Sequence, residues 1–294
     1  MRVAVSRDES GARLIDCGIH VLGGLDAGVA LAEVCMSGLG HVSVTPGDPA
    51  VWPGPWITVR TDQPVAACMA SQYAGWQIVG DRYFAMGSGP MRAMRGREKM
   101  LEALELHDSG DAAVGVLESG RLPTSAVCRQ IAEQCSVDSE NLTLLVAPTR
   151  SLAGTLQVVA RSVETALHKM HELGFDLRTI VSGFGTAPLP PPSADDVAAI
   201  GRTNDSVLYG AETTLWLLGD DVELERIGPQ IPSSASKDHG QPFAAIFDRY
   251  GRDFYKIDPH LFSPAVVNLF NLNSGRTYRF GTTSPDVLRR SFGP

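Results

Sequence analysis

The feature that most constrains the fold is the alternation of strand-like and helix-like segments between residues 110 and 215. Short apolar runs that predict strands alternate with segments of helical periodicity, in the order DAAVGVLESG, TSAVCRQIAEQCSV, NLTLLVAPT, residues 151–174 and TIVSGFGTAPLPPP. Strand-like segments dominate both ends of the chain. A helix stripe and a sheet face must each be buried against another element. We therefore expect an α/β protein, with α+β character at both ends, built from two packed lobes.

The sequence marks the boundaries between the lobes less clearly than it marks the alternating strands and helices. We expect residues 1–294 to form a single two-lobed unit, with crossovers near residues 60–65 and 183–193. The second crossover falls on a proline cluster, and proline-rich segments are stiff connectors.

Composition excludes several classes of protein. The net charge is −8 and no run of lysine or arginine occurs, so a nucleic-acid partner is not expected. The five cysteines are odd in number and include no C-x-x-C pair, which favours reduced thiols in the cytoplasm. MRVAVSRDES has no apolar core of a signal peptide, and no apolar run is long enough to span a bilayer. We expect a cytoplasmic protein that does not enter membranes.

Familiar catalytic and cofactor motifs are incomplete. GSGPMR and GFGTAP lack the third glycine of a dinucleotide-binding loop, and no Walker A sequence or G-x-S-x-G elbow occurs. His168 and His171 have no accompanying carboxylate pattern, so we expect no metal site. Ser234 and Lys237 have the bare spacing of a Ser-Lys nucleophile, but the partner motifs S-D-N and K-T-G are missing.

The segment 151–174 predicts an amphipathic helix that Ser151 caps and Gly174 ends. At about 100° per residue, its apolar side chains form one stripe: Leu152, Leu156, Val159, Val163, Leu167, Met170 and Leu173. Arg161 and Glu164 lie away from that stripe and are neighbours at i, i+3. They are either a solvated ion pair or part of a pocket wall. A strand ends just before the helix, where α/β proteins place ligands, and this favours the wall.

The chain resembles the methenyltetrahydromethanopterin cyclohydrolases. The similar stretches run in order from about residue 12 to 281: IDCGIHVLGGLDAG, LAEVCMSGLG, ASQYAGW, FAMGSGP, LVAPTRSLAGTLQVVARSVETALHKMHELGFD, GRTNDSVLYG, PSSASKDHGQPF and DFYKIDPHLFSPAVVNLFNLNSG. The resemblance implies a homotrimer of two-lobed subunits with a pocket between the lobes. It also implies reversible hydrolysis of a 5,10-methenyl pterin C1 carrier to its 5-formyl form in formaldehyde oxidation, with no cofactor other than that carrier. Members of the family carry about a helix's worth of chain before the segment that matches RVAVSR, whereas here Met1 stands almost at that strand.

The resemblance assigns the catalytic pair to Arg161 and Glu164. Glu164 is then the general base that orients water, and Arg161 keeps Glu164 ionised. Further polar or aromatic side chains are candidates for binding the pterin: Tyr73, Ser88, Gly89, Asn204, Asp205, Ser233, Ser234 and Asp238. Turn formation explains the polar ones equally well, and a core position explains Tyr73 and Trp76.

Two other functions fit the sequence. One is a Ser234–Lys237 acyl hydrolase, which an activated phosphonate would label. The other is a protein that binds a reduced pterin without converting it.

Overall fold

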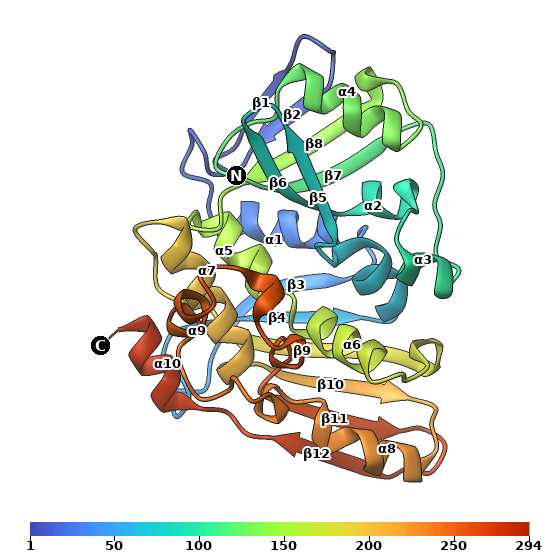
Figure 1. The fold of residues 1–294 in the computed structure, drawn as a ribbon, viewed down its shortest axis with the longest axis vertical. Helices are drawn as coiled ribbons and strands as arrows, with labels where there is room; N and C mark the ends of the chain where they lie inside the picture. Colours follow the sequence, from blue (N-terminus) through green and yellow to red (C-terminus); the bar gives the residue numbers. More distant parts are fainter. Residues whose placement is uncertain (294) are drawn as a thin grey trace. The chain divides into compact units, whose positions relative to one another are not determined.

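The computed structural model describes residues 1–293, which form two compact units. Unit 1 comprises Met1–Gly40 and Ala66–Gln157, and unit 2 comprises His41–Val65 and the chain from Val158 onward. Each unit contains one six-stranded sheet with helices, as Figure 1 shows. The expected α/β class with two sheet-containing lobes is confirmed. The proline-rich segment after Ile180–Pro188 stays within unit 2.

The sheet of unit 1 has the strand order β1-β2-β8-β7-β6-β5. These strands are β1 (Ala4–Arg7), β2 (Arg13–Asp16), β5 (Trp76–Gly80), β6 (Tyr83–Ser88), β7 (Ala113–Glu118) and β8 (Leu142–Ala147). The three strands β2, β8 and β7 are parallel, and the other pairs are antiparallel. Parallel strands are normally covered on both faces, and β7 and β8 read accordingly as nearly continuous apolar runs.

Helices cover both faces of this sheet (Figure 1). Side chains of α4 (Ser125–Gln134) and α2 (Pro90–Arg95) share one core with Leu117 of β7. Side chains of α1 (Leu25–Cys35) share the other core with Val116. Thr124 caps α4 by accepting the Val127 N–H, as its position predicts. The remaining helical segments of unit 1 are the π-helix η1 (Val65–Gln72), α3 (Lys99–Ala103) and η2 (Ser139–Asn141). The first residue of η1, Val65, still belongs to unit 2.

The sheet of unit 2 has the order β12-β11-β10-β9-β4-β3 and contains one parallel pair, β10 with β11. Its strands are β3 (His41–Pro46), β4 (Pro55–Thr61), β9 (Ile180–Pro188), β10 (Glu212–Leu217), β11 (Val266–Asn271) and β12 (Thr277–Gly281). Its helices are α6 (Ser162–Glu172), α7 (Asp196–Asp205), α8 (Asp221–Ile227), α9 (Phe243–Arg249) and α10 (Pro285–Phe292). Its shorter helical segments are η3 (Leu177–Thr179), η4 (Ser206–Gly210), η5 (Gly228–Gln230), η6 (Ser233–Ala235), η7 (Phe254–Lys256) and η8 (Pro259–Leu261).

A second helical layer of unit 2 forms its own core. Tyr209 of η4, Phe243 of α9 and Leu288 of α10 are each no more than 1% exposed and lie in one apolar cluster. This cluster fixes η4 and the end of α7, which belong to the candidate site described below.

The prediction of one continuous helix over 151–174 is wrong at its centre. Two helices form instead, α5 (Leu152–Val159) and α6, with Ala160 and Arg161 in the turn between them. The predicted ends are confirmed: the Ser151 hydroxyl accepts the Gly154 N–H at 3.0 Å, and Gly174 has φ +79°. Arg161 has φ −98° and ψ 13°, a sparsely populated backbone region in which many active-site residues lie.

Candidate active site

Arg161 and Glu164 are both buried, with exposed fractions of 8% and 4%. The interpretation of these residues as a solvated ion pair is therefore wrong. Arg161 is the N-cap of α6 and Glu164 lies in its first turn. The positive end of the helix dipole interacts favourably with negative charge at that position.

Two glycines of β9 allow the start of α6 to pack directly on the sheet. A Cβ at Gly185 would lie 2.3 Å from the Ser162 Oγ, and a Cβ at Gly183 would lie 2.7 Å from Val163 Cγ1. The Thr213 hydroxyl of β10 donates to the Ser162 carbonyl at 3.0 Å. The turn that carries Arg161 is thus held against a rigid strand pair.

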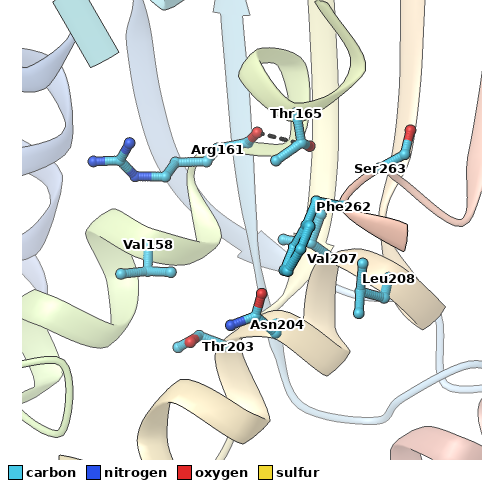
Figure 2. A pocket seen from close by; sticks show the side chains of 9 residues that line it. All are labelled: Val158, Arg161, Thr165, Thr203, Asn204, Val207, Leu208, Phe262 and Ser263. Atoms are coloured by element: carbon cyan, nitrogen blue, oxygen red, sulfur yellow. Dashed lines mark hydrogen bonds between the residues drawn. The ribbon is translucent and has the colours of Figure 1, made fainter. Parts of the chain in front are cut away.

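A cavity of about 90 Å³ adjoins this turn within unit 2, and we call it the Arg161 cavity (Figure 2). Four segments line it: the α5–α6 junction, the end of α7, η4 and the residues after η8. The lining residues are Val158, Arg161, Thr165, Thr203, Asn204, Val207, Leu208, Phe262 and Ser263. In Figure 2 the Phe262 ring lies beside the Asn204 side chain, and the Arg161 side chain extends on the Val158 side. The structure thus brings the predicted residues Arg161 and Asn204 to one cavity, whereas Glu164 is not among its lining residues.

The polar lining residues differ in their hydrogen bonds. The Thr165 hydroxyl donates to the Arg161 carbonyl at 3.0 Å, and the Thr203 hydroxyl donates to the Ala199 carbonyl at 2.9 Å. The Asn204 amide nitrogen donates to its own helix, to the carbonyl of Ile200 at 2.9 Å. Its Oδ1 is therefore the atom of this side chain that can accept a bond from a ligand.

The other predicted binding residues of unit 2 are engaged in the protein itself. Asp205 is fully buried and its Oδ1 accepts the Phe243 N–H at 2.7 Å, which satisfies the start of α9. Burial raises the pKa of the Asp205 carboxyl to about 7. The buried Ser233 hydroxyl donates to the Leu208 carbonyl.

The polar loop that follows Ser233 is partly exposed. Ser234 and Lys237 are exposed, whereas the buried Asp238 accepts bonds from the Tyr250 hydroxyl at 3.0 Å and the Asp258 N–H at 3.1 Å. No distance or burial singles out Ser234 and Lys237 as a nucleophile and base. The binding roles of Ser233, Ser234, Asp205 and Asp238 stay predictions.

Tyr73, Ser88 and Gly89 all lie in unit 1. The Gly89 N–H donates to the Ser71 carbonyl at 2.8 Å, and Gly89 has φ +91°, a backbone conformation that favours glycine. Ser88 is 2% exposed and its hydroxyl lies 3.4 Å from Cys35 Sγ. The Arg92 guanidinium lies 4.8 Å from the centre of the Tyr73 ring. A binding role for these three residues stays a prediction.

Trp76 is a core residue, 3% exposed. This confirms the structural interpretation of that aromatic side chain.

Across residues 1–293, no group of three or more His, Cys, Asp or Glu side chains could hold a metal ion. In the same part of the chain, no helix has the length and apolarity needed to cross a membrane.

Sequence reasoning missed several residues of the Arg161 cavity, namely Val158, Thr165, Thr203, Val207, Leu208, Phe262 and Ser263. It also missed Lys169, which is 1% exposed and donates to the His260 carbonyl at 2.6 Å. Burial lowers the pKa of the Lys169 ammonium to about 8. Lys169 precedes Met170 of the apolar stripe on α6. No pattern in the local sequence distinguishes it from a lysine at the surface.

Two six-stranded sheets with helices, and a small, mainly apolar cavity lined in part by the buried Arg161, define an α/β protein with a candidate ligand site. The model of the family described as Cyclohydrolase (MCH) matches residues 1–292, so the chain belongs to this family. The family inferred from the sequence is confirmed.

The chain is similar to three proteins called methenyltetrahydromethanopterin cyclohydrolase. It is 50% identical over 289 residues to that of Rhodopirellula baltica, covering 97% of this chain and 87% of the relative. It is 46% identical to that of Methylobacillus flagellatus, covering 100% of this chain and 90% of the relative. It is 45% identical to that of Methanospirillum hungatei, covering 99% of this chain and 92% of the relative.

Proposed function

We propose that this protein catalyses the reversible hydrolysis of 5,10-methenyltetrahydromethanopterin to the 5-formyl compound in the C1 metabolism of formaldehyde oxidation. This proposal is supported by the family match and by the similar proteins, which align with nearly the whole chain and are named for that activity. The observation that carries the proposal is the burial of Arg161 and Glu164 at the start of α6, with Arg161 on a cavity.

The chemistry needs a positioned water rather than an activated electrophile. The methenyl carbon belongs to an amidinium cation and is already electrophilic. Glu164 takes a proton from water as the oxygen attacks that carbon, and the C–N10 bond then breaks. That proton passes to N10 as the bond breaks, and the remaining hydroxyl proton leaves to solvent. The cation and one water therefore give the neutral 5-formyl compound and one H⁺, so atoms and charges balance. Arg161 stabilises the Glu164 carboxylate and the oxygen as charge develops.

The proposal includes no metal and no organic cofactor beyond the carrier. The substrate cation supplies the electrophile that a Lewis acid would otherwise have to create. Activity is therefore expected to survive dialysis against EDTA. Loss of activity on dialysis, with recovery after one added metal ion, would contradict this part.

The assembly and compartment belong to the same proposal. We infer a homotrimer from the resemblance of the sequence. We infer the cytoplasm from the five buried cysteines, none of which forms a disulfide in the described chain. Light scattering should give three times the mass of the chain.

The decisive experiment is a spectrophotometric assay with the methenyl carrier, run beside methenyltetrahydrofolate. Glu164→Gln should lower kcat by a factor of about 10² to 10⁴, the range that general-base catalysis contributes. Glu172→Gln is the matched control, because Glu172 lies on the same helix but is exposed. Turnover of E164Q near the wild-type rate would refute the assignment. Tight binding without loss of methenyl absorbance would instead indicate a pterin-binding protein.

A further inference from the structure

Lys169 is a buried lysine of α6 that the proposed chemistry does not use. It is 1% exposed, and burial lowers the pKa of its ammonium to about 8. Lysine is almost never fully buried unless it is paired, because its ammonium loses hydration there. A methionine would fill similar space without that cost. A costly charged group in a core is typical of a functional requirement rather than of a contribution to stability.

The position of Lys169 on α6 relates it to the proposed catalytic pair. Arg161, Thr165 and Lys169 follow one another at intervals of four residues, so they lie along one side of the helix and its N-cap. The first two line the Arg161 cavity, as Figure 2 shows. Lys169 continues this row, about one turn further along α6.

The partner of Lys169 lies in the segment that provides another wall of the same cavity. The Lys169 ammonium donates to the His260 carbonyl at 2.6 Å. Two residues after His260, Phe262 lines the Arg161 cavity. The bond from Lys169 therefore joins two walls of the cavity, the row on α6 and the segment of Phe262.

The two ends of the segment 258–264 are held by bonds that do not involve α6. The Asp258 N–H donates to the Asp238 carboxylate at 3.1 Å, and the Ser233 N–H donates to the Pro264 carbonyl at 3.0 Å. Between these ends, the bond from Lys169 fixes the segment relative to the helix that carries the catalytic pair.

We propose that Lys169 is a positioning residue for the hydrolysis: its bond to the His260 carbonyl holds Phe262 in place against the helix that carries the catalytic pair. This inference rests on the proposed function. Lys169 takes no part in the proton transfer and acts through the geometry of the cavity wall. A displacement of about 1 Å at a reaction site can slow a reaction by a factor of about 10², so a fixed wall matters for the rate.

Lys169→Met separates positioning from stability. The methionine removes the donor, but His260 is exposed, so water can satisfy its carbonyl without fixing its distance from α6. We expect the Tm at pH 7 to stay equal or rise, whereas kcat for the methenyl carrier should fall about tenfold or more with KM changed less than about threefold. Amide hydrogen exchange of residues 260–263 should become about tenfold faster, with that of β10 unchanged.

Lys256→Met is the matched control, because Lys256 lies in the nearby η7 but is exposed, with its ammonium 3.5 Å from the Asp253 carboxylate. K256M should keep the wild-type kcat and the wild-type exchange of residues 260–263. An active K169M with the wild-type kcat, or a K169M whose Tm falls clearly, overturns the positioning role and leaves the proposed function standing. A wild-type protein that does not convert the carrier overturns the function. In that case faster exchange in K169M still supports positioning of the segment, and unchanged exchange overturns it.

Discussion

The burial of Lys169 makes a quantitative prediction about stability and pH. Its ammonium is 1% exposed and donates to the His260 carbonyl. Removal from water lowers the pKa of Lys169 from 10.5 to about 8, although the Asp258 carboxylate opposes the shift. Lys169→Met replaces the charged chain with an unbranched apolar one that fills similar space.

The size of the effect follows from the two pKa values. Between pH 8 and 10.5 the unfolded chain binds more protons at this position than the folded chain, so the stability of the wild type rises with pH. The contribution of Lys169 to the free energy of unfolding is fully present above pH 10.5 and is lost as the pH falls through 8. Between pH 7.5 and 10 the two titrations change the free energy of unfolding by about 2 kcal/mol.

Urea unfolding of wild type and K169M at several pH values measures this difference. Trp52, Trp56 and Trp216 lie in unit 2 and report on its unfolding. As the pH falls from 10 to 7.5, the free energy of unfolding of K169M should rise by about 2 kcal/mol relative to that of the wild type. Subtraction cancels the other titrating groups, and Lys256→Met at the surface serves as control. A difference that is flat over this range would refute the burial argument.

Two further variants test the supports of the site. Burial raises the pKa of Asp205 to about 7, so the folded protein holds an extra proton there only below that pH. The wild type should therefore lose free energy of unfolding between pH 5 and pH 8, whereas Asp205→Asn should not lose this contribution. Urea titrations of both proteins at the two pH values measure the difference. Gly185→Ala should lower the free energy of unfolding by about 1–3 kcal/mol and also lower kcat. The added Cβ pushes Ser162, and with it the turn at Arg161, away from the sheet. A variant with a lowered Tm but the wild-type kcat would show that the turn tolerates this displacement.

Local patterns predicted the elements well and their assembly poorly. Most of the helical stripe is buried, since Leu156, Val163 and Leu167 are 0% exposed, but Leu152 at its start is 37% exposed. The caps at Ser151 and Gly174 lie where their chemistry places them. The order of strands in each sheet depends on pairings such as β2 with β8, which lie more than a hundred residues apart. No local periodicity encodes such a pairing.

The site was predictable to a similar degree. Spacing and resemblance predicted Arg161 and Glu164 as a catalytic pair, and the structure shows that both are buried. Spacing alone also allowed a solvated pair, because burial depends on the surrounding structure. Phe262 and Ser263 reach the cavity from about a hundred residues downstream, in a segment whose sequence is typical of an ordinary loop.

The break between α5 and α6 gives the Arg161–Glu164 pair its chemical character. In one continuous helix, both residues would lie mid-helix, where every backbone N–H is already bonded. Because α6 begins after Arg161, the Arg161 carbonyl accepts its first N–H, from Thr165 at 2.9 Å, and Glu164 lies in the first turn. The positive end of the α6 dipole favours a carboxylate in that turn. Alanine and arginine are both good helix formers, so tertiary packing on β9 and β10 is what starts a new helix at this point and with it an environment for a charged base.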